Sequence, residues 1–173
     1  MNIYQLIEER HSIRHYTNQE VEDDKLNRIL EAGRLAPSGK NAQAWKFIVT
    51  EKEENKEALV KACKGQKFIA EADKIITVVV DETEVYQKHG TYMTSFPMDG
   101  AIALQHMMLA ATEEGLGTCW IGAFKEAEVK EVLDIPDPYR VVGLTPLGYP
   151  AKDGRDRGRK SLDEVVCWEK FEK

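Results

Sequence analysis

No charged side chain occurs in GAIALQHMMLAAT, residues 100–112 of the chain. A helix that is apolar on nearly every side must be buried over most of its surface. The chain has 173 residues, the size of one domain, and offers such a helix little internal cover. We therefore expect one domain, residues 1–173, in which this helix is central and packs partly against a second copy of the chain.

Helices and strands are expected to alternate irregularly around this central helix. Apolar periodicity and β-branched runs predict both kinds of element. The expected helices are 3–10, 23–35, 55–64 and 126–133, and the expected strands are 46–50, 75–80, 118–121 and 141–144. Asn2 and Gln5 have the spacing of a capping box at the first helix. Because few strand–helix–strand units appear, an α+β fold is favoured over a doubly wound parallel sheet.

Composition and residue spacing argue against several classes of protein. The net charge of −6 disfavours nucleic acid as a partner. No apolar run is long enough to span a membrane, and residues 1–5 lack a signal pattern, so we expect a cytoplasmic protein. Cys63, Cys119 and Cys167 are too widely spaced for a disulfide framework or a zinc site, and the histidines lack metal-ligand spacing. We expect no metal.

Two basic clusters stand out against the acidic background. One is RHSIR, residues 10–14, and the other is KDGRDRGRK, residues 152–160. The planar fork of arginine donors matches phosphate oxygens, a serine hydroxyl adds a donor, and glycine allows close backbone approach. The clusters suit a terminal phosphate. A solvated basic surface patch explains them equally well from composition alone.

Two further segments carry polar groups or glycines in suggestive patterns. APSGKNAQAW, residues 36–45, could read the polar edge of a flat heterocycle, although an ordinary polar loop has the same composition. GLGTCWIG, residues 115–122, resembles a dinucleotide fingerprint but follows a helix and enters a strand, so it fails the context that motif requires. Since neither a nucleophile elbow nor a metalloprotease motif occurs, we expect a cofactor to carry the chemistry.

Taken in order, these four segments resemble motifs of the flavin-dependent nitroreductase family. RHSIRHY (10–16) is similar to R-x-S-x-R-x-[FY], APSGKNAQAW (36–45) to A-P-S-x-x-N-x-Q-x-W, and GLGTCWIG (115–122) to G-x-G-x-x-W-I-G. RGRK (157–160) takes the place of the family's C-terminal basic motif. The resemblance implies an α+β fold with a mixed or antiparallel central sheet flanked by helices. It also implies an intertwined homodimer with two FMN sites at the interface.

The resemblance also implies roles for individual residues. Arg10, Ser12, Arg157 and Arg159 would hold the FMN phosphate. His11 would stand where an arginine is common, and Arg14 would lie near the pyrimidine edge, where its charge stabilises the reduced flavin. Pro37, Ser38 and Asn41 would come from the partner subunit, and Gly39 of the same loop would also bind the cofactor. Trp120, Ile121 and Gly122 would pass beside the isoalloxazine, with the Gly122 N–H aimed at N5. Gln66 would lie at the flavin edge.

The function implied is hydride transfer from NADH or NADPH through FMN to an electron acceptor such as a nitroaromatic or a quinone. Because donor and acceptor would share one flavin face, the kinetics would be ping-pong. Fold does not fix reaction, so two alternatives stay open. The chain could be a dehalogenase or dehydrogenase of the same fold, or a non-catalytic FMN-binding protein.

Overall fold

The central feature of the computed structural model, which describes residues 1–172, is a four-stranded antiparallel sheet in the order β1-β2-β4-β3. The strands are β1 (Trp45–Thr50), β2 (Lys74–Asp81), β3 (Gly117–Thr118) and β4 (Tyr139–Gly148). β2 pairs with β1 on one side and with β4 on the other. The predicted α+β fold is confirmed, with the antiparallel form of the sheet.

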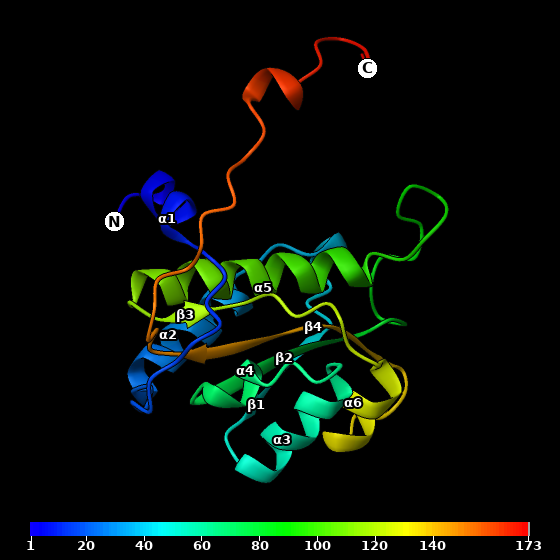
Figure 1. Ribbon diagram of the computed structural model, residues 1–173. Coiled ribbons are helices and arrows are strands. Elements are labelled where there is room, and N and C mark those ends of the chain that lie inside the picture. Colours follow the sequence, from blue (N-terminus) through cyan, green and yellow to red (C-terminus); the bar gives the residue numbers. More distant parts are fainter. Residues whose placement is uncertain (173) are drawn as a thin grey trace.

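Helices cover both faces of this sheet (Figure 1). One face packs against α3 (Glu53–Ala62), α4 (Phe68–Glu71) and α6 (Glu126–Val132), and the other against α2 (Asp23–Arg34) and α5 (Phe96–Glu113). Every residue of β2 is buried. Ile75 belongs to the first core and Ile76 to the second, which explains why this strand is apolar throughout instead of alternating.

The uncharged segment forms most of α5, which begins earlier than the sequence suggested because Pro97 is accommodated in its first turn. Its inner face is buried against α2 and the sheet, including Leu104, Met107 and Ala111. Its outer face is left partly open, with Ile102 at 37% exposure.

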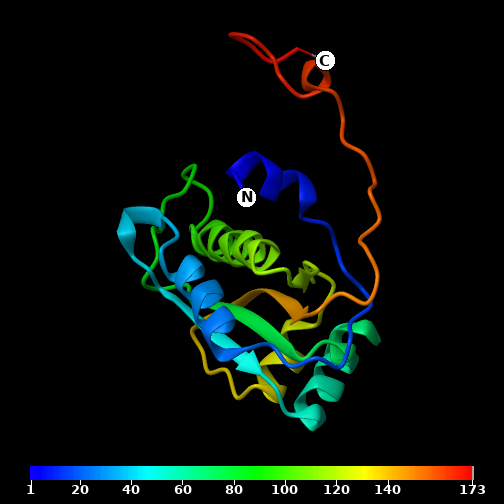
Figure 2. The same ribbon diagram turned by 90° about the vertical axis from the view of Figure 1, so that its left-hand side faces the viewer.

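The two ends of the chain lie apart from the sheet. α1 (Ile3–Glu9) begins with the predicted capping box, and none of its residues is buried. The C-terminal segment leaves the sheet after β4, runs past α1, and extends away from the body as far as the short η2 turn (Leu162–Glu164) (Figures 1 and 2). Trp168 and Phe171 on this segment are 80% and 84% exposed.

The strand expected at 118–121 is wrong in its bounds. β3 ends at Thr118, and the Cys119 N–H donates to the Thr145 hydroxyl at 3.1 Å instead of continuing the ladder. Ile121 then rejoins the sheet through an isolated bridge to Leu144. The expected strand 141–144 is the middle of the longer β4. The sequence did not predict α4, because a helix of four residues is too short to produce a helical periodicity.

Within residues 1–172, no helix has both the length and the hydropathy needed to cross a bilayer.

Candidate functional site

The first basic cluster lies at the edge of the sheet, held between β3 and the end of β4. The Ile13 N–H donates to the Thr118 carbonyl at 2.8 Å, and Ser12 forms a parallel bridge with Thr118. Tyr16 bridges to Pro150 and donates its hydroxyl to the Ile13 carbonyl at 2.8 Å. The segment is therefore an extended strand-like edge, not a free loop.

Extended backbone explains the spacing of the functional residues in this segment. Successive side chains of an extended chain point to opposite sides, so residues two apart share a side. Ile13 is 8% exposed and packs on Gly117, whereas Arg10, Ser12 and Arg14 alternate with it. A buried isoleucine therefore directs the three polar side chains to the other side.

The second basic cluster is brought onto the first by the chain after β4. The Ala151 N–H donates to the His15 carbonyl at 2.9 Å, and Gly154 packs directly on His11. A Cβ atom on Gly154 would lie 2.3 Å from the His11 Cβ, so only glycine permits this approach. The two ends of the chain thus meet at one place.

A cavity of about 220 Å³, here called the arginine cavity, lies where the clusters meet. Its lining residues are Arg10, His11, Ser12, Arg14, Arg155, Arg157 and Arg159. Arg28, Arg34 and Arg140 pair with carboxylates elsewhere, but within residues 1–172 none of the five arginines of this cavity lies within ion-pair distance of a carboxylate. Arginines without a carboxylate partner around one cavity are suited to bind an anion.

A second cavity of about 480 Å³, the tryptophan cavity, shares Arg10, Ser12 and Arg159 with the first. Its remaining lining residues are Ile7, Gln105, Met108 and Trp120. Trp120 is 38% exposed, and its ring lies against β4, where a Cβ on Gly143 would come within 3.2 Å of the indole. An exposed aromatic ring next to an anion site suits a ligand that carries both a phosphate and a flat ring system.

The residues after Trp120 offer backbone groups and not side chains. Ile121 is 1% exposed, and both its N–H and its carbonyl pair with Leu144, so its side chain belongs to the core. Gly122 is exposed, and its N–H has no acceptor in the described part of the chain. Gln66 lies beside this segment, because its amide donates to the Ala123 carbonyl at 3.2 Å.

A buried thiol next to the site is not set up as a nucleophile. Cys119 is 1% exposed, and burial raises the pKa of its thiol above the ordinary value. A thiol in this state is largely protonated at neutral pH. The site therefore contains donors and cations, and the chemistry has to come from a bound group.

The polar loop expected at the site lies elsewhere in the monomer. Residues 37–41 sit beside the first turn of α5, where the Gly39 N–H donates to the buried Asp99 carboxylate at 2.9 Å and Asp99 also accepts from Ser95 at 2.7 Å. Pro37, Ser38, Gly39 and Asn41 line neither the arginine cavity nor the tryptophan cavity. One chain therefore does not bring all the candidate residues together.

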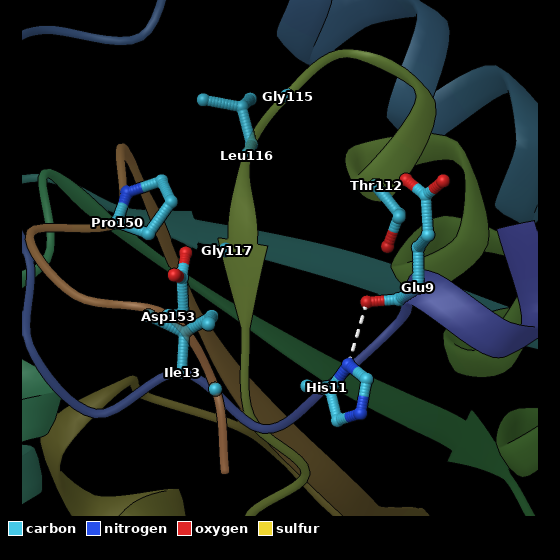
Figure 3. A pocket seen from close by; sticks show the side chains of 10 residues that line it. Glu9, His11, Ile13, Thr112, Gly115, Leu116, Gly117, Pro150 and Asp153 are labelled. Carbon is cyan, nitrogen blue, oxygen red and sulfur yellow. Dashed lines mark hydrogen bonds between the residues drawn. The ribbon is translucent and has the colours of Figure 1, made fainter. Parts of the chain in front are cut away.

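A third cavity, drawn in Figure 3, shares His11 with the arginine cavity. It has a volume of about 390 Å³, and the Nδ1 atom of His11 lies 2.8 Å from the Glu9 carbonyl at its rim. The carboxylates of Glu9 and Asp153 line it. These negative charges make it unsuitable for phosphate, so the arginine cavity is the candidate anion site.

The sequence-based prediction of the site lacks four residues that line the two site cavities. Ile7 belongs to α1, and Gln105 and Met108 belong to α5, where an apolar helix gave no motif to mark them. Arg155 belongs to the basic cluster that the sequence singles out, and only its two-residue spacing from Arg157 could have marked it as part of the same cavity.

This architecture, an antiparallel sheet with helices on both faces and a cationic cavity at its edge, is that of a cofactor-binding α+β protein. Comparison with known proteins identifies the family. The sequence model of the protein family described as "Nitroreductase family" matches residues 7–149 of this chain. The chain therefore belongs to the nitroreductase family.

Individual relatives agree with this assignment. A protein of Archaeoglobus fulgidus, whose name pairs NADH dehydrogenase with NAD(P)H nitroreductase, is 31% identical over 155 residues, which cover 87% of this chain and 86% of that protein. The structure of a nitroreductase family protein from Clostridium difficile 630 is similar with a TM-score of 0.90 at 31% identity, covering 99% of this chain and all of that one. An FMN-dependent nitroreductase from Clostridium difficile R20291 is similar with a TM-score of 0.84 at 29% identity, over 98% and 100% of the two chains.

Proposed function

We propose that this chain is an FMN-dependent oxidoreductase that takes hydride from NADH or NADPH and passes electrons to a small acceptor such as a nitroaromatic or a quinone. The observation that carries the proposal is the set of unpaired arginines around a cavity that continues to an exposed tryptophan. The name of the Clostridium difficile R20291 relative, an FMN-dependent nitroreductase, supports the choice of flavin.

The residues present fit a phosphorylated flavin. Arg10, Ser12 and Arg159 line both cavities, and Arg157 lines the arginine cavity, so these four side chains would bind the phosphate. Arginine forks give charge-assisted bidentate bonds to phosphate oxygens. FMN, when bound, supplies the redox chemistry by accepting hydride from the nicotinamide and donating electrons to the acceptor.

Other residues would orient the ring and tune it. Arg14 would stabilise negative charge at the pyrimidine edge of the reduced ring. Trp120 would cover part of the ring and exclude water, and the unpaired Gly122 N–H would donate toward N5. Ile121 would contribute only its main chain. Gln66 is tied to Ala123, close to Gly122, and would border the flavin edge.

We propose a homodimer that completes the site, with residues 1–173 of each copy forming one FMN-binding domain. Residues 37–41 lie outside both cavities of their own chain, and the partner subunit would present the same loop there. Tyr4 on α1 and Trp168 on the C-terminal segment are 76% and 80% exposed, more apolar surface than a monomer normally leaves open. A second copy covering the outer side of α5 would bury them and intertwine the chains.

The compartment is proposed from the chemistry. The three cysteines are free, and the proposed donor is an intracellular reductant. Both features suit the cytoplasm.

The test is to purify the protein, identify the bound chromophore, and add NADH or NADPH without oxygen. A yellow protein that releases FMN and bleaches with either donor supports the proposal, and parallel initial-rate plots with an acceptor support the ping-pong scheme. Bound FMN that neither donor reduces would point to a different reaction on the same fold. Reduction without turnover on a panel of nitroaromatics and quinones would point to a non-catalytic flavoprotein.

A further inference from the structure

The arginine cavity holds more cationic side chains than the proposed phosphate site uses. Arg155 lines it together with Arg157, Arg159, Arg10 and Arg14. Arg155, like the other four, has no carboxylate within ion-pair distance among residues 1–172. Five arginines therefore line about 220 Å³, and a bound anion would lower the repulsion between their charges.

A single phosphate monoester does not offset this charge. It carries a charge of about −2 and has three strong acceptor oxygens. Bidentate contacts from Arg10, Arg157 and Arg159 with one from Ser12 already supply about seven donors, which satisfies those oxygens. With Arg14 assigned to the pyrimidine edge, Arg155 remains without an anion.

The arginines of this cavity fall into two groups. Arg10 and Arg159 also line the tryptophan cavity and so face the route toward Trp120. Arg14, Arg155 and Arg157 line the arginine cavity alone. Among these three, only Arg155 is left without a role by the pyrimidine edge and the FMN phosphate.

We infer that Arg155 binds a second phosphate group, carried by the nicotinamide dinucleotide and not by FMN. The inference rests on the proposed function, because it names a residue that recognises the donor at the same site. The phosphate could be the pyrophosphate common to NADH and NADPH or the 2′-phosphate that only NADPH has. A contact to the pyrophosphate would let Arg155 bind either donor, whereas a contact to the 2′-phosphate would make it favour NADPH over NADH.

The experiment compares the wild type with Arg155→Gln, which keeps a polar side chain and removes the charge. Arg159→Gln is the matched variant for the FMN phosphate, and Lys152→Gln is the control for charge loss in the same segment outside the cavity. Three quantities are measured: the dissociation constant of FMN by flavin fluorescence, the dissociation constants of NAD⁺ and NADP⁺ for the holoprotein by calorimetry, and KM for NADH and NADPH at saturating FMN.

Arg155→Gln is expected to weaken dinucleotide binding and raise KM by about tenfold or more, the loss typical of a charge-assisted bidentate contact, while FMN affinity stays within about twofold. An effect confined to NADP⁺ and NADPH identifies the 2′-phosphate, and an equal effect on both dinucleotides identifies the pyrophosphate. Arg159→Gln is expected to show the reverse pattern, with weaker FMN binding.

Three results would overturn the inference. Weaker FMN binding by Arg155→Gln, with unchanged dinucleotide binding, would make Arg155 a fourth ligand of the FMN phosphate. Dissociation of the dimer without a change in dinucleotide binding would make it an interface residue, and no change in any of these quantities would leave it without a role. A wild-type protein that binds no FMN would instead refute the proposed function itself, and with it this inference.

Discussion

Replacing Gly154 with alanine should separate the two basic segments that form the arginine cavity. The added Cβ would lie 2.3 Å from the His11 Cβ and 3.2 Å from the Ile13 Cδ1. Carbon atoms in ordinary contact are about 3.5–4.0 Å apart, so the segments must move apart by more than about 1 Å. The His11 Cβ cannot rotate away, because it is fixed to the backbone, and Ile13 is held by its hydrogen bond to Thr118.

The displacement is expected to appear mainly in ligand affinity. Overpacking of this kind costs about 1–3 kcal/mol, and the exposed C-terminal segment can yield while the sheet stays folded. Losing one charge-assisted contact to phosphate, worth about 1.5–3 kcal/mol, weakens FMN binding by about 10- to 100-fold. Fluorescence titration with FMN, together with a thermal melt, measures both effects.

Two further variants make this test specific. Lys152→Ala removes a positive charge from the same segment but adds no atom against His11, and it should bind FMN almost normally. The double variant Gly154→Ala/His11→Gly removes the clashing Cβ and should recover part of the lost affinity. If Gly154→Ala binds FMN as tightly as the wild type and melts at the same temperature, the packing of the two segments is not what forms the site.

Three further predictions concern other groups. Arg14→Ala should weaken FMN binding and lower the flavin reduction potential by about 30–60 mV, which for two electrons corresponds to about 1.5–3 kcal/mol. Dye equilibration measures the potential, and an unchanged value would contradict the role proposed for Arg14. Asp99→Ala should cost about 2–4 kcal/mol of stability and speed amide exchange around Gly39, with Asp99→Asn intermediate; equal exchange in all three proteins would contradict this. The Arg140 guanidinium lowers the pKa of Glu126, so the pair stabilises the fold above the ordinary carboxyl pKa and loses this effect as acid is added through the lowered value. Glu126→Gln should therefore unfold more easily than the wild type at pH 7, and the difference should shrink as the pH falls below the ordinary carboxyl pKa. A difference that does not shrink in acid would refute the linkage.

Much of the fold could be predicted from local sequence because the signals were strong. The β-branched run within β2 has both faces covered, so its pattern is unambiguous. The end of β3 was predicted wrongly because the Cys119 N–H donates to the Thr145 hydroxyl instead of to a main-chain carbonyl. The two residues are 26 positions apart, so the local sequence could not predict this contact.

The site shows the same division between local and non-local information. Arg10, Ser12 and Arg14 alternate with a buried Ile13, and such spacing is visible in the sequence. Their meeting with Arg155, by contrast, depends on Gly154 packing against a residue far away in the chain. In the proposed site, residues 37–41 come from a second copy of the chain, and their local sequence carries no information about that contact.

The central claim is that the arginine cavity holds the flavin through its phosphate, and the most direct measurement is the ratio of the dissociation constants for riboflavin and FMN. The wild type should prefer FMN by about 100-fold or more, as expected for several charge-assisted contacts. The variant Arg10→Gln/Arg159→Gln should lose most of this preference while its riboflavin affinity stays nearly unchanged. A wild-type protein that binds riboflavin as tightly as FMN would contradict the account.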